Sequence, residues 1–224
     1  MGAKSQEGSI FIQLLLFRIA IDQPVIEGKA RRKGGDRRRE IVEAALRCLE
    51  RVGYAELTAR KIAAEAGMSL GHITYHFADM DEVLAETCLL ASERLQVAAD
   101  AKITLPGATP AERLEAFLKA GFSDEFLQMS HLRTRIDLWS AAMSYPTIAQ
   151  TERALYDRYR AQLEKLLHQV SDPWKTDRIP MVSDLIMATL DGLWLDWMRR
   201  RDPQAVQNGL EACVLFARLR LGGA

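Results

Sequence analysis

The sequence predicts an all-α protein, and three observations support that prediction. Apolar residues recur at intervals of three and four along most of the 224 residues, and no segment shows the alternation of a strand. Proline directly follows a capping residue at Thr109-Pro110 and at Asp202-Pro203, which is how helices often begin. Hydrophobic residues make up 48% of the chain, which is enough to bury a core between helices. We expect about nine helices.

The first three expected helices form a helix-turn-helix unit. The first begins at Asp36, after a pair of glycines, and ends at Val52. The second follows the N-cap residue Thr58, and Gly67 supplies the positive φ of its C-terminus. Ser69 caps the third helix. Spacing at three and four residues predicts that its inner face carries Leu70, Ile73 and Phe77.

Six more helices are expected after this unit. Asp79 caps the first of them, and loops with proline or glycine separate several of the others. Their expected ranges are 80–101, 110–121, 130–144, 147–170, 179–200 and 203–221. We therefore divide the chain into a head at residues 29–80, a body at residues 81–224 and an N-terminal extension at residues 1–28.

The extension at residues 1–28 has no assigned role. Its apolar run, residues 10–21, is too short to span a bilayer, which takes roughly 20 residues. Glu7, Arg18 and the lack of a cleavage site argue against a signal peptide. The extension is either an extra helix that docks on the body or on a partner, or an upstream stretch wrongly included in the reading frame.

The three cysteines lie far apart, each among apolar residues of an expected helix. An odd number of cysteines without ligand spacing argues against a disulfide framework or a metal site. We expect free buried thiols in a reducing compartment, and hence a cytoplasmic protein.

Charge is divided unevenly along the chain. Residues 29–78 contain 11 Lys or Arg and 6 Asp or Glu, a net charge of +5, and the other residues contain 19 and 24, a net charge of −5. A basic segment beside an acidic one is typical of a local nucleic-acid contact attached to a domain with another task.

The stretch from Thr58 to Phe77, with the helix before it and the segment Asp79–Leu84 after it, resembles the DNA-binding domain of the tetracycline-repressor (TetR) family. The resemblance implies a recognition helix that enters the major groove of DNA. The expected DNA contacts are Thr58, at the start of the second helix, and six residues at the cap and on the outer side of the third helix. These six residues are Ser69, Gly71, His72, Thr74, Tyr75 and His76. His72 and His76 also have the spacing of metal ligands, but no third ligand accompanies them, so no metal is expected.

A basic arm precedes the first helix. We expect it to contact phosphates or a minor groove, the alternative being a solvated tail. The arm residues expected to bind DNA are Arg31, Arg32, Arg37 and Arg38. The family commonly has a lysine at the start of the fourth helix, where this chain has Met80, and this difference removes one expected phosphate contact.

Two segments of the body, Leu138–Met143 and Asp191–Leu195, are similar to segments of the choline-responsive BetI-type repressors. The resemblance implies an effector pocket in the body. Asp191 and Trp194 are three apart and share a helix face, whereas Asp137 and Trp139 are two apart and cannot both line one pocket. The residues expected to bind the effector are Trp139, Asp191, Trp194 and Arg135.

The chemistry of these four residues leaves the effector class open. An acid and indole rings favour an organic cation or amine. Arg135 would repel such a ligand unless an acid pairs with it, and an unpaired Arg135 in the pocket would favour an anion. The alternative for Asp191 is a buried salt bridge or hydrogen bond, and the alternative for Trp139 and Trp194 is core or dimer packing.

The last two helices are expected to pair with those of a second copy as a four-helix bundle. The stripe expected to form this dimer interface has spacings of four, three and four: Val206, Leu210, Cys213 and Ala217.

Together these features predict a homodimeric transcriptional regulator, a repressor that binds a palindromic DNA operator and is released by a small-molecule effector. No catalytic residue, cofactor, metal or membrane partner is expected. Two alternatives are a constitutive DNA-binding dimer without an effector and a helical ligand-binding protein that lacks DNA binding.

Overall fold

The computed structural model describes residues 29–104 and 106–222, with side chains from Gly35 onward. The predicted extension at residues 1–28 therefore lies outside the described residues. Contacts divide the chain into two units, with the boundary between Arg37 and Arg38. The predicted boundary between head and body after residue 80 stays a prediction.

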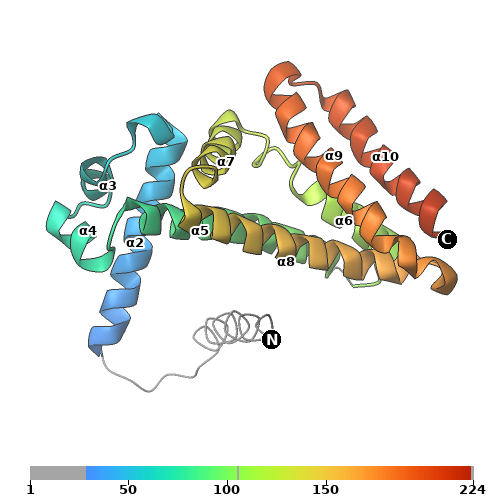
Figure 1. Ribbon diagram of the computed structural model, residues 1–224, viewed down its shortest axis with the longest axis horizontal. Coiled ribbons are helices and arrows are strands. Elements are labelled where there is room, and N and C mark those ends of the chain that lie inside the picture. The colour runs from blue at the N-terminus through green and yellow to red at the C-terminus, as the bar shows by residue number, and fades with distance from the viewer. Residues whose placement is uncertain (1–28, 105, 223–224) are drawn as a thin grey trace, which may run out of the picture. The chain divides into compact units, whose positions relative to one another are not determined.

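The described ranges contain nine α-helices and two short 3-10 helices and no strand, which confirms the all-α prediction (Figure 1). The helices are α2 (Lys29–Val52), η1 (Tyr54–Glu56), α3 (Ala59–Glu65), α4 (Leu70–His76), α5 (Met80–Ile103), α6 (Pro110–Ala120), α7 (Met129–Ala142), α8 (Pro146–Val170), η2 (Pro173–Arg178), α9 (Ile179–Arg200) and α10 (Pro203–Leu221). None of them is both long enough and apolar enough to cross a membrane.

The start of α2 differs from the prediction. The helix begins at Lys29 and continues through Gly34 and Gly35, so the predicted start at Asp36 is wrong. Glycine inside a helix costs about 1 kcal/mol relative to alanine but does not forbid the helix. The surrounding lysines and arginines are good helix formers, and a helix that already exists on the C-terminal side is extended without a new nucleus.

Four of the predicted caps make the expected hydrogen bonds, and the predicted cap Ser69 of α4 does not. The backbone N–H of Lys61 donates to the hydroxyl of Thr58 at 3.2 Å, and that of Glu82 donates to Asp79 at 2.9 Å. Thr109 and Glu112 form a full capping box at the start of α6. Asp202 accepts from two backbone N–H groups of α10.

A small core holds the helix-turn-helix unit together. It contains Ile41 of α2, Ile62 of α3, Ile73 of α4 and Val83 of α5, each almost fully buried. Met80, the residue that replaces the family's lysine, packs against this core. Apolar packing is therefore what this position contributes in the described structure.

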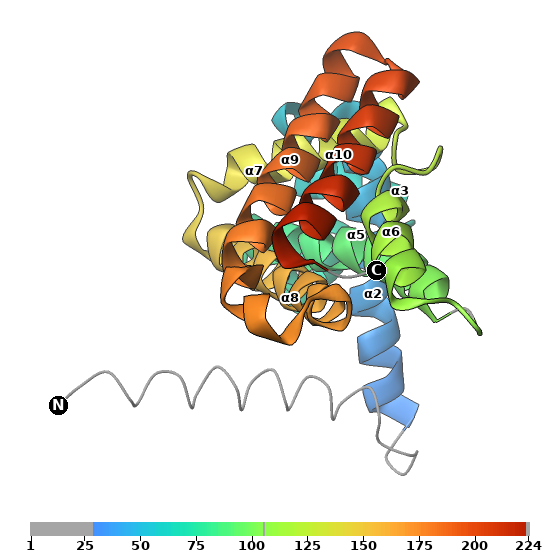
Figure 2. The same ribbon diagram turned by 90° about the vertical axis from the view of Figure 1, so that its right-hand side faces the viewer.

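The body buries a second and larger core between α5, α6, α8, α9 and α10. The helices α9 and α10 lie side by side along their length (Figure 2). This core contains the four residues predicted to line the dimer interface: Val206, Leu210, Cys213 and Ala217.

The prediction that those four residues form the dimer interface is wrong. Each is at most 6% exposed within a single chain, because the stripe packs against the other helices of its own body. The opposite side of α10 and the outer side of α9 carry exposed apolar residues instead, which we call the outer face: Met181, Leu185, Leu195, Leu215 and Leu219.

Candidate DNA-binding and effector sites

Helix α4 presents a polar face and buries an apolar one. Ile73 and Phe77 are 3% exposed, and they anchor the helix in the head core. The residues of α4 predicted to contact DNA point the other way: Gly71, His72, Thr74 and Tyr75 are exposed, and Tyr75 is the most exposed of them at 84%. Leu70 was expected on the inner face but is 40% exposed, since it is the first residue of the helix.

Local contacts order the side chains on this face. The hydroxyl of Ser69 lies 2.8 Å from Nδ1 of His72, so it bonds to that ring and makes no capping bond to the backbone. The hydroxyl of Thr74 donates to the carbonyl of Gly71 at 3.2 Å. The ring of Tyr75 meets that of His76 edge to face, with centroids 5.0 Å apart. The exposed face is therefore partly preorganised for contact with a groove.

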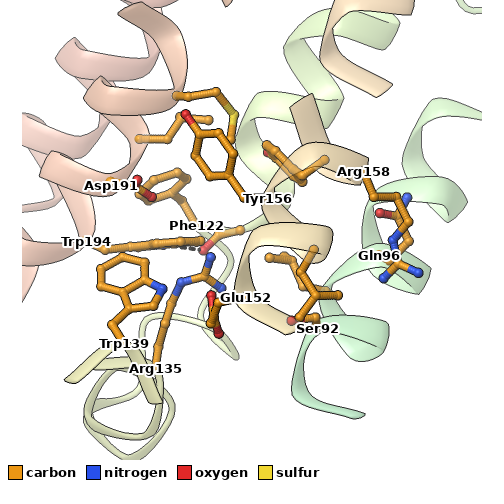
Figure 3. Close-up of a pocket in the computed structure, with 16 residues that line it drawn as sticks. Ser92, Gln96, Phe122, Arg135, Trp139, Glu152, Tyr156, Arg158, Asp191 and Trp194 are labelled. Carbon is orange, nitrogen blue, oxygen red and sulfur yellow. Dashed lines mark hydrogen bonds between the residues drawn. The ribbon is translucent and has the colours of Figure 1, made fainter. Parts of the chain in front are cut away.

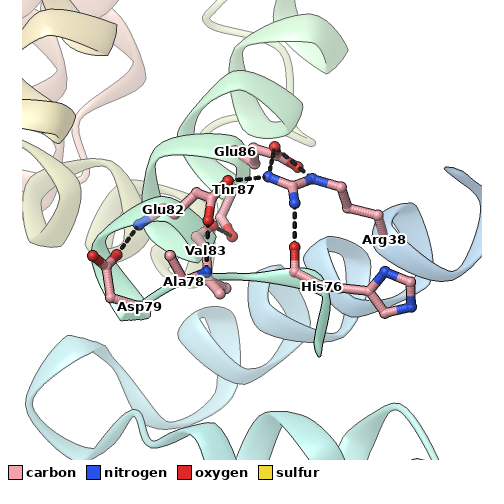
Figure 4. A network of polar contacts seen from close by, with 8 residues as sticks. All are labelled: Arg38, His76, Ala78, Asp79, Glu82, Val83, Glu86 and Thr87. Carbon is pink, nitrogen blue, oxygen red and sulfur yellow. Dashed lines mark hydrogen bonds and ion pairs between the residues drawn. The ribbon is translucent and has the colours of Figure 1, made fainter. Parts of the chain in front are cut away.

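The side chain of Arg38, which was predicted to contact DNA, makes its contacts within the head instead. Its guanidinium donates to Glu86 at 2.8 Å, to Glu82 and to the carbonyl of His76 (Figure 4). The guanidinium also stacks on the ring of Phe77, 4.0 Å from the ring centroid. These contacts tie α2 to the end of α4 and the start of α5. In the described structure Arg38 therefore holds helices of the head together.

The other arm residues are described less fully. The side chains of Arg31 and Arg32 lie outside the described side chains, and Arg37 is exposed. Their role in DNA binding stays a prediction.

The four residues predicted to bind an effector line one cavity in the body (Figure 3). Trp139 and Arg135 come from α7, and Asp191 and Trp194 from α9, and they face a space of about 100 Å³. Phe122, from the segment after α6, stacks on Trp194 with ring centroids 5.5 Å apart. We call this space the effector cavity, after the predicted role of these residues.

Trp194 is fixed in this wall by a hydrogen bond. Its indole N–H donates to the carbonyl of Gly121 at 3.0 Å. A β-carbon on Gly121 would lie 2.8 Å from the indole ring, so the close approach requires glycine at this position. The orientation of Trp194 is therefore set by the backbone at the end of α6.

Two family models match the chain. Residues 41–87 match the model described as bacterial regulatory proteins, tetR family, and residues 110–216 match that described as BetI-type transcriptional repressor, C-terminal. The chain belongs to the tetR family. It is a DNA-binding transcriptional regulator and not an enzyme.

Individual tetR-family proteins are similar over most of the chain. The HTH-type transcriptional regulator BetI of Cronobacter sakazakii is 25% identical over 84% of this chain and 92% of that protein. The crystal structure of a transcriptional regulator from Pseudomonas aeruginosa is 29% identical, with a TM-score of 0.71 over 84% of this chain and 92% of that chain. A regulator from Saccharomonospora viridis, solved in complex with choline, is 22% identical, with a TM-score of 0.62 over 81% of this chain and 95% of that chain.

In this tetR-family regulator the two charged groups predicted to bind the effector, Arg135 and Asp191, line the cavity without forming an ion pair with each other. The guanidinium carbon of Arg135 lies 3.8 Å from the ring centroid of Trp194 and 5.1 Å from that of Trp139. Burial lowers the pKa of Arg135, and the charges of Glu152 and Asp191 raise it in part. Burial raises the pKa of Asp191, and the positive charge of Arg135 opposes this change. Each group thus responds to the other, but the two form no ion pair within 4.0 Å among the described residues.

Glu152 contributes a second acid to the cavity. Its carboxylate accepts a hydrogen bond from the thiol of Cys88 at 2.7 Å. Burial, together with the charge of Glu152, raises the pKa of the Cys88 thiol, which therefore stays protonated and donates.

Sequence reasoning missed the cavity residues contributed by α8. Glu152, Tyr156 and Tyr159 line the cavity, and their spacing of four and three places them on one helix face. An acid and two tyrosines at that spacing on one helix are the signal that could have found them.

Helix α7 also contacts the head. The backbone N–H of Tyr54, in η1, donates to Asp137 at 2.8 Å, and Arg133 donates to the carbonyl of Glu50 in α2 at 2.6 Å. As the spacing predicted, Asp137 faces away from the pocket that Trp139 lines. One helix therefore carries both a cavity face and a head-contacting face.

Proposed function

We propose that this regulator is a homodimeric, cytoplasmic repressor that leaves a palindromic operator when a small molecule binds in the effector cavity. The repressor role fits the tetR family and its BetI-type members. The exposed polar face of α4 supplies the DNA contacts of each copy.

The observation that carries the effector role is the position of α7. Arg135 and Trp139 of this helix line the cavity, while Arg133 and Asp137 hold the end of α2 and the start of η1. A ligand that displaces α7 would lengthen or break the hydrogen bonds that Arg133 and Asp137 make to the head. Ligand binding can release DNA only if it favours the head position that fits the operator less well.

A dimer is needed for a palindromic site. Two recognition helices must lie about 34–36 Å apart, or a multiple of this, to reach successive major grooves. The outer face of α9 and α10 is the surface that we propose for pairing, because it exposes apolar side chains on both helices.

The residues of the cavity give conflicting indications of the chemical class of the effector. The acid and indole rings favour an organic cation or amine, and choline is the ligand in the Saccharomonospora viridis structure. In this chain, however, the two indoles already hold the guanidinium of Arg135.

The DNA-binding part of the proposal is tested with an operator selected from random duplex DNA. We expect Tyr75→Ala to weaken specific binding by about tenfold or more without changing the melting temperature, because Tyr75 is exposed and contributes nothing to the core. Trp174→Ala, a substitution of an aromatic residue that is 93% exposed and lies outside the cavity lining, is the control for DNA affinity.

The effector part is tested by adding small cations, anions and zwitterions to the complex with the operator. Trp139→Ala is expected to keep operator affinity and to lose the response to any compound that releases the wild type. If no compound of these classes changes operator affinity, the constitutive dimer replaces the repressor that we propose.

A further inference from the structure

The effector cavity contains a cation, Arg135, that has no polar partner among the described residues. Arg135 makes no hydrogen bond and no ion pair with any residue that the structure describes, and its Nε is buried and unsatisfied. A guanidinium has five N–H donors in a planar fork, which suits the two oxygens of a carboxylate. A buried donor left without an acceptor is costly, so a ligand that supplies one gains affinity.

The place that a free organic cation would occupy is already taken. The guanidinium of Arg135 lies over Trp194 and close to Trp139, where cation–π attraction is strongest. A ligand with only a positive charge would have to displace this group or lie beside a like charge.

The same cavity contains one acid without a partner. Asp191 is half-buried and makes no hydrogen bond or ion pair with any other described residue. Glu152, the other acid, already accepts from Cys88. A ligand with only a negative charge would satisfy Arg135 but would face both carboxylates.

We propose that the effector is a small zwitterion, whose carboxylate pairs with Arg135 and whose ammonium group pairs with Asp191. The proposal rests on the proposed function only in taking this cavity as the effector site. Arg135 and Asp191 line the same space without pairing with each other, so one ligand with both charges supplies the partner that each lacks. The cavity of about 100 Å³ is small and suits a ligand of the size of a small amino acid.

Three compounds of nearly equal shape test the charge pattern on the wild-type protein. Trimethylglycine has both charges, choline has only the positive one, and 3,3-dimethylbutyrate has only the negative one. We expect calorimetry to show trimethylglycine binding about 10- to 100-fold more tightly than either of the others, since each lacks one charge-assisted contact. Equal or tighter binding of choline or of 3,3-dimethylbutyrate overturns the proposal, as does the absence of trimethylglycine binding at millimolar concentration.

Two substitutions assign the charges to residues. Arg135→Met is expected to abolish the preference for trimethylglycine over choline, and Asp191→Asn the preference over 3,3-dimethylbutyrate. Arg153→Met and Asp157→Asn remove the same charges from exposed positions of α8 outside the cavity and are expected to keep both preferences. If the cavity variants keep both preferences as well, the ligand binds elsewhere and the assignment is wrong.

A titration of operator DNA separates this inference from the proposed function. Tight trimethylglycine binding with unchanged operator affinity would leave the zwitterion site in place and contradict the effector role. Release of the operator by choline but not by trimethylglycine would support the effector role and overturn the zwitterion.

Discussion

Arg38 stabilises the position of the recognition helix through contacts that no neighbour in sequence provides. Its partners Glu82 and Glu86 lie on α5, and its third acceptor is the carbonyl of His76 at the end of α4. We expect Arg38→Ala to lower the free energy of unfolding by about 1–3 kcal/mol, because two half-buried carboxylates lose a charged donor. Thermal melting followed by circular dichroism measures this loss.

Salt dependence distinguishes this role from a phosphate contact. Each phosphate contact adds roughly 0.9 to the slope of log affinity against log salt. Arg38→Ala is expected to weaken operator binding with an unchanged slope, whereas replacing Arg31, Arg32 and Arg37 together is expected to flatten it. Arg39→Ala is the matched control, since that side chain is 68% exposed and pairs with Glu43 of its own helix. A slope that falls by about one unit in Arg38→Ala would restore Arg38 to the DNA interface.

Asp191 makes the stability of the free protein depend on pH. Burial raises the pKa of this carboxyl, against the opposing charge of Arg135. A carboxyl with a higher pKa in the folded chain favours folding fully below its unfolded value, near 3.9, and loses that contribution as pH rises through the folded value. We expect Asp191→Asn to melt at a higher temperature than the wild type at pH 7, with the difference shrinking as the pH falls toward 4.

Melting curves across this pH range, with Asp157→Asn as the exposed control, measure the effect. A lower melting temperature for Asp191→Asn than for the wild type at pH 7 would contradict this expectation, because attraction between Asp191 and Arg135 would then outweigh the burial of the carboxylate.

Individual site residues could be predicted where the relevant spacing is local. Asp191 and Trp194 lie on one face of one helix, and the cavity contains both. Arg38 could not be assigned, because its carboxylate partners are 44 and 48 residues away in sequence. The stacking of Arg135 on Trp194 joins α7 to α9 and likewise depends on tertiary packing.

Helix α7 joins the effector cavity to the head through a single turn. Gly53, with φ of 77°, precedes Tyr54, whose backbone N–H donates a hydrogen bond to the carboxylate of Asp137. A β-carbon on Gly53 would lie 3.3 Å from that carboxylate. We expect Asp137→Ala to speed amide hydrogen exchange over residues 50–57, because Tyr54 loses its acceptor and the local structure opens more readily.

Exchange followed by mass spectrometry gives a readout for each segment. The peptides of α9 and α10 are expected to be unchanged, and so is the whole pattern in Ser140→Ala, an exposed position of α7. Unchanged exchange over residues 50–57 in Asp137→Ala would mean that α7 does not hold the turn.

Elements were predictable where a capping group marks the end of a helix. Thr58, Asp79, Thr109 and Asp202 start helices at the positions predicted from the sequence. The start of α2 was not predictable from its glycines, since their cost is small and the flanking basic residues favour a helix.

The whole molecule shows why an apolar stripe alone does not identify an interface. Helix α10 carries apolar residues on two sides, one with Leu210 at its centre and one with Leu215 and Leu219. Both have helical spacing, so only packing within the chain decides which side is internal. The first is buried and the second exposed, and Leu219 is 71% exposed. The bundle with a second copy stays a prediction, but sequence periodicity chose a stripe of α10 that is buried within its own chain.

The corrected stripe makes a direct prediction for assembly. Leu185→Asp combined with Leu219→Asp places two charges on the outer face, where desolvation on pairing would be costly, and neither residue contributes to the core. We expect sedimentation equilibrium to show folded monomers that keep the helical signal of the wild type. These monomers are expected to lose operator affinity, since a single recognition helix cannot span two half-sites.

Leu210→Asp is expected instead to unfold the body, because its side chain is 5% exposed. Val97→Asp is the matched control, being 68% exposed on α5, and is expected to leave the dimer intact. A dimer that survives the double substitution on the outer face would exclude this surface as the interface.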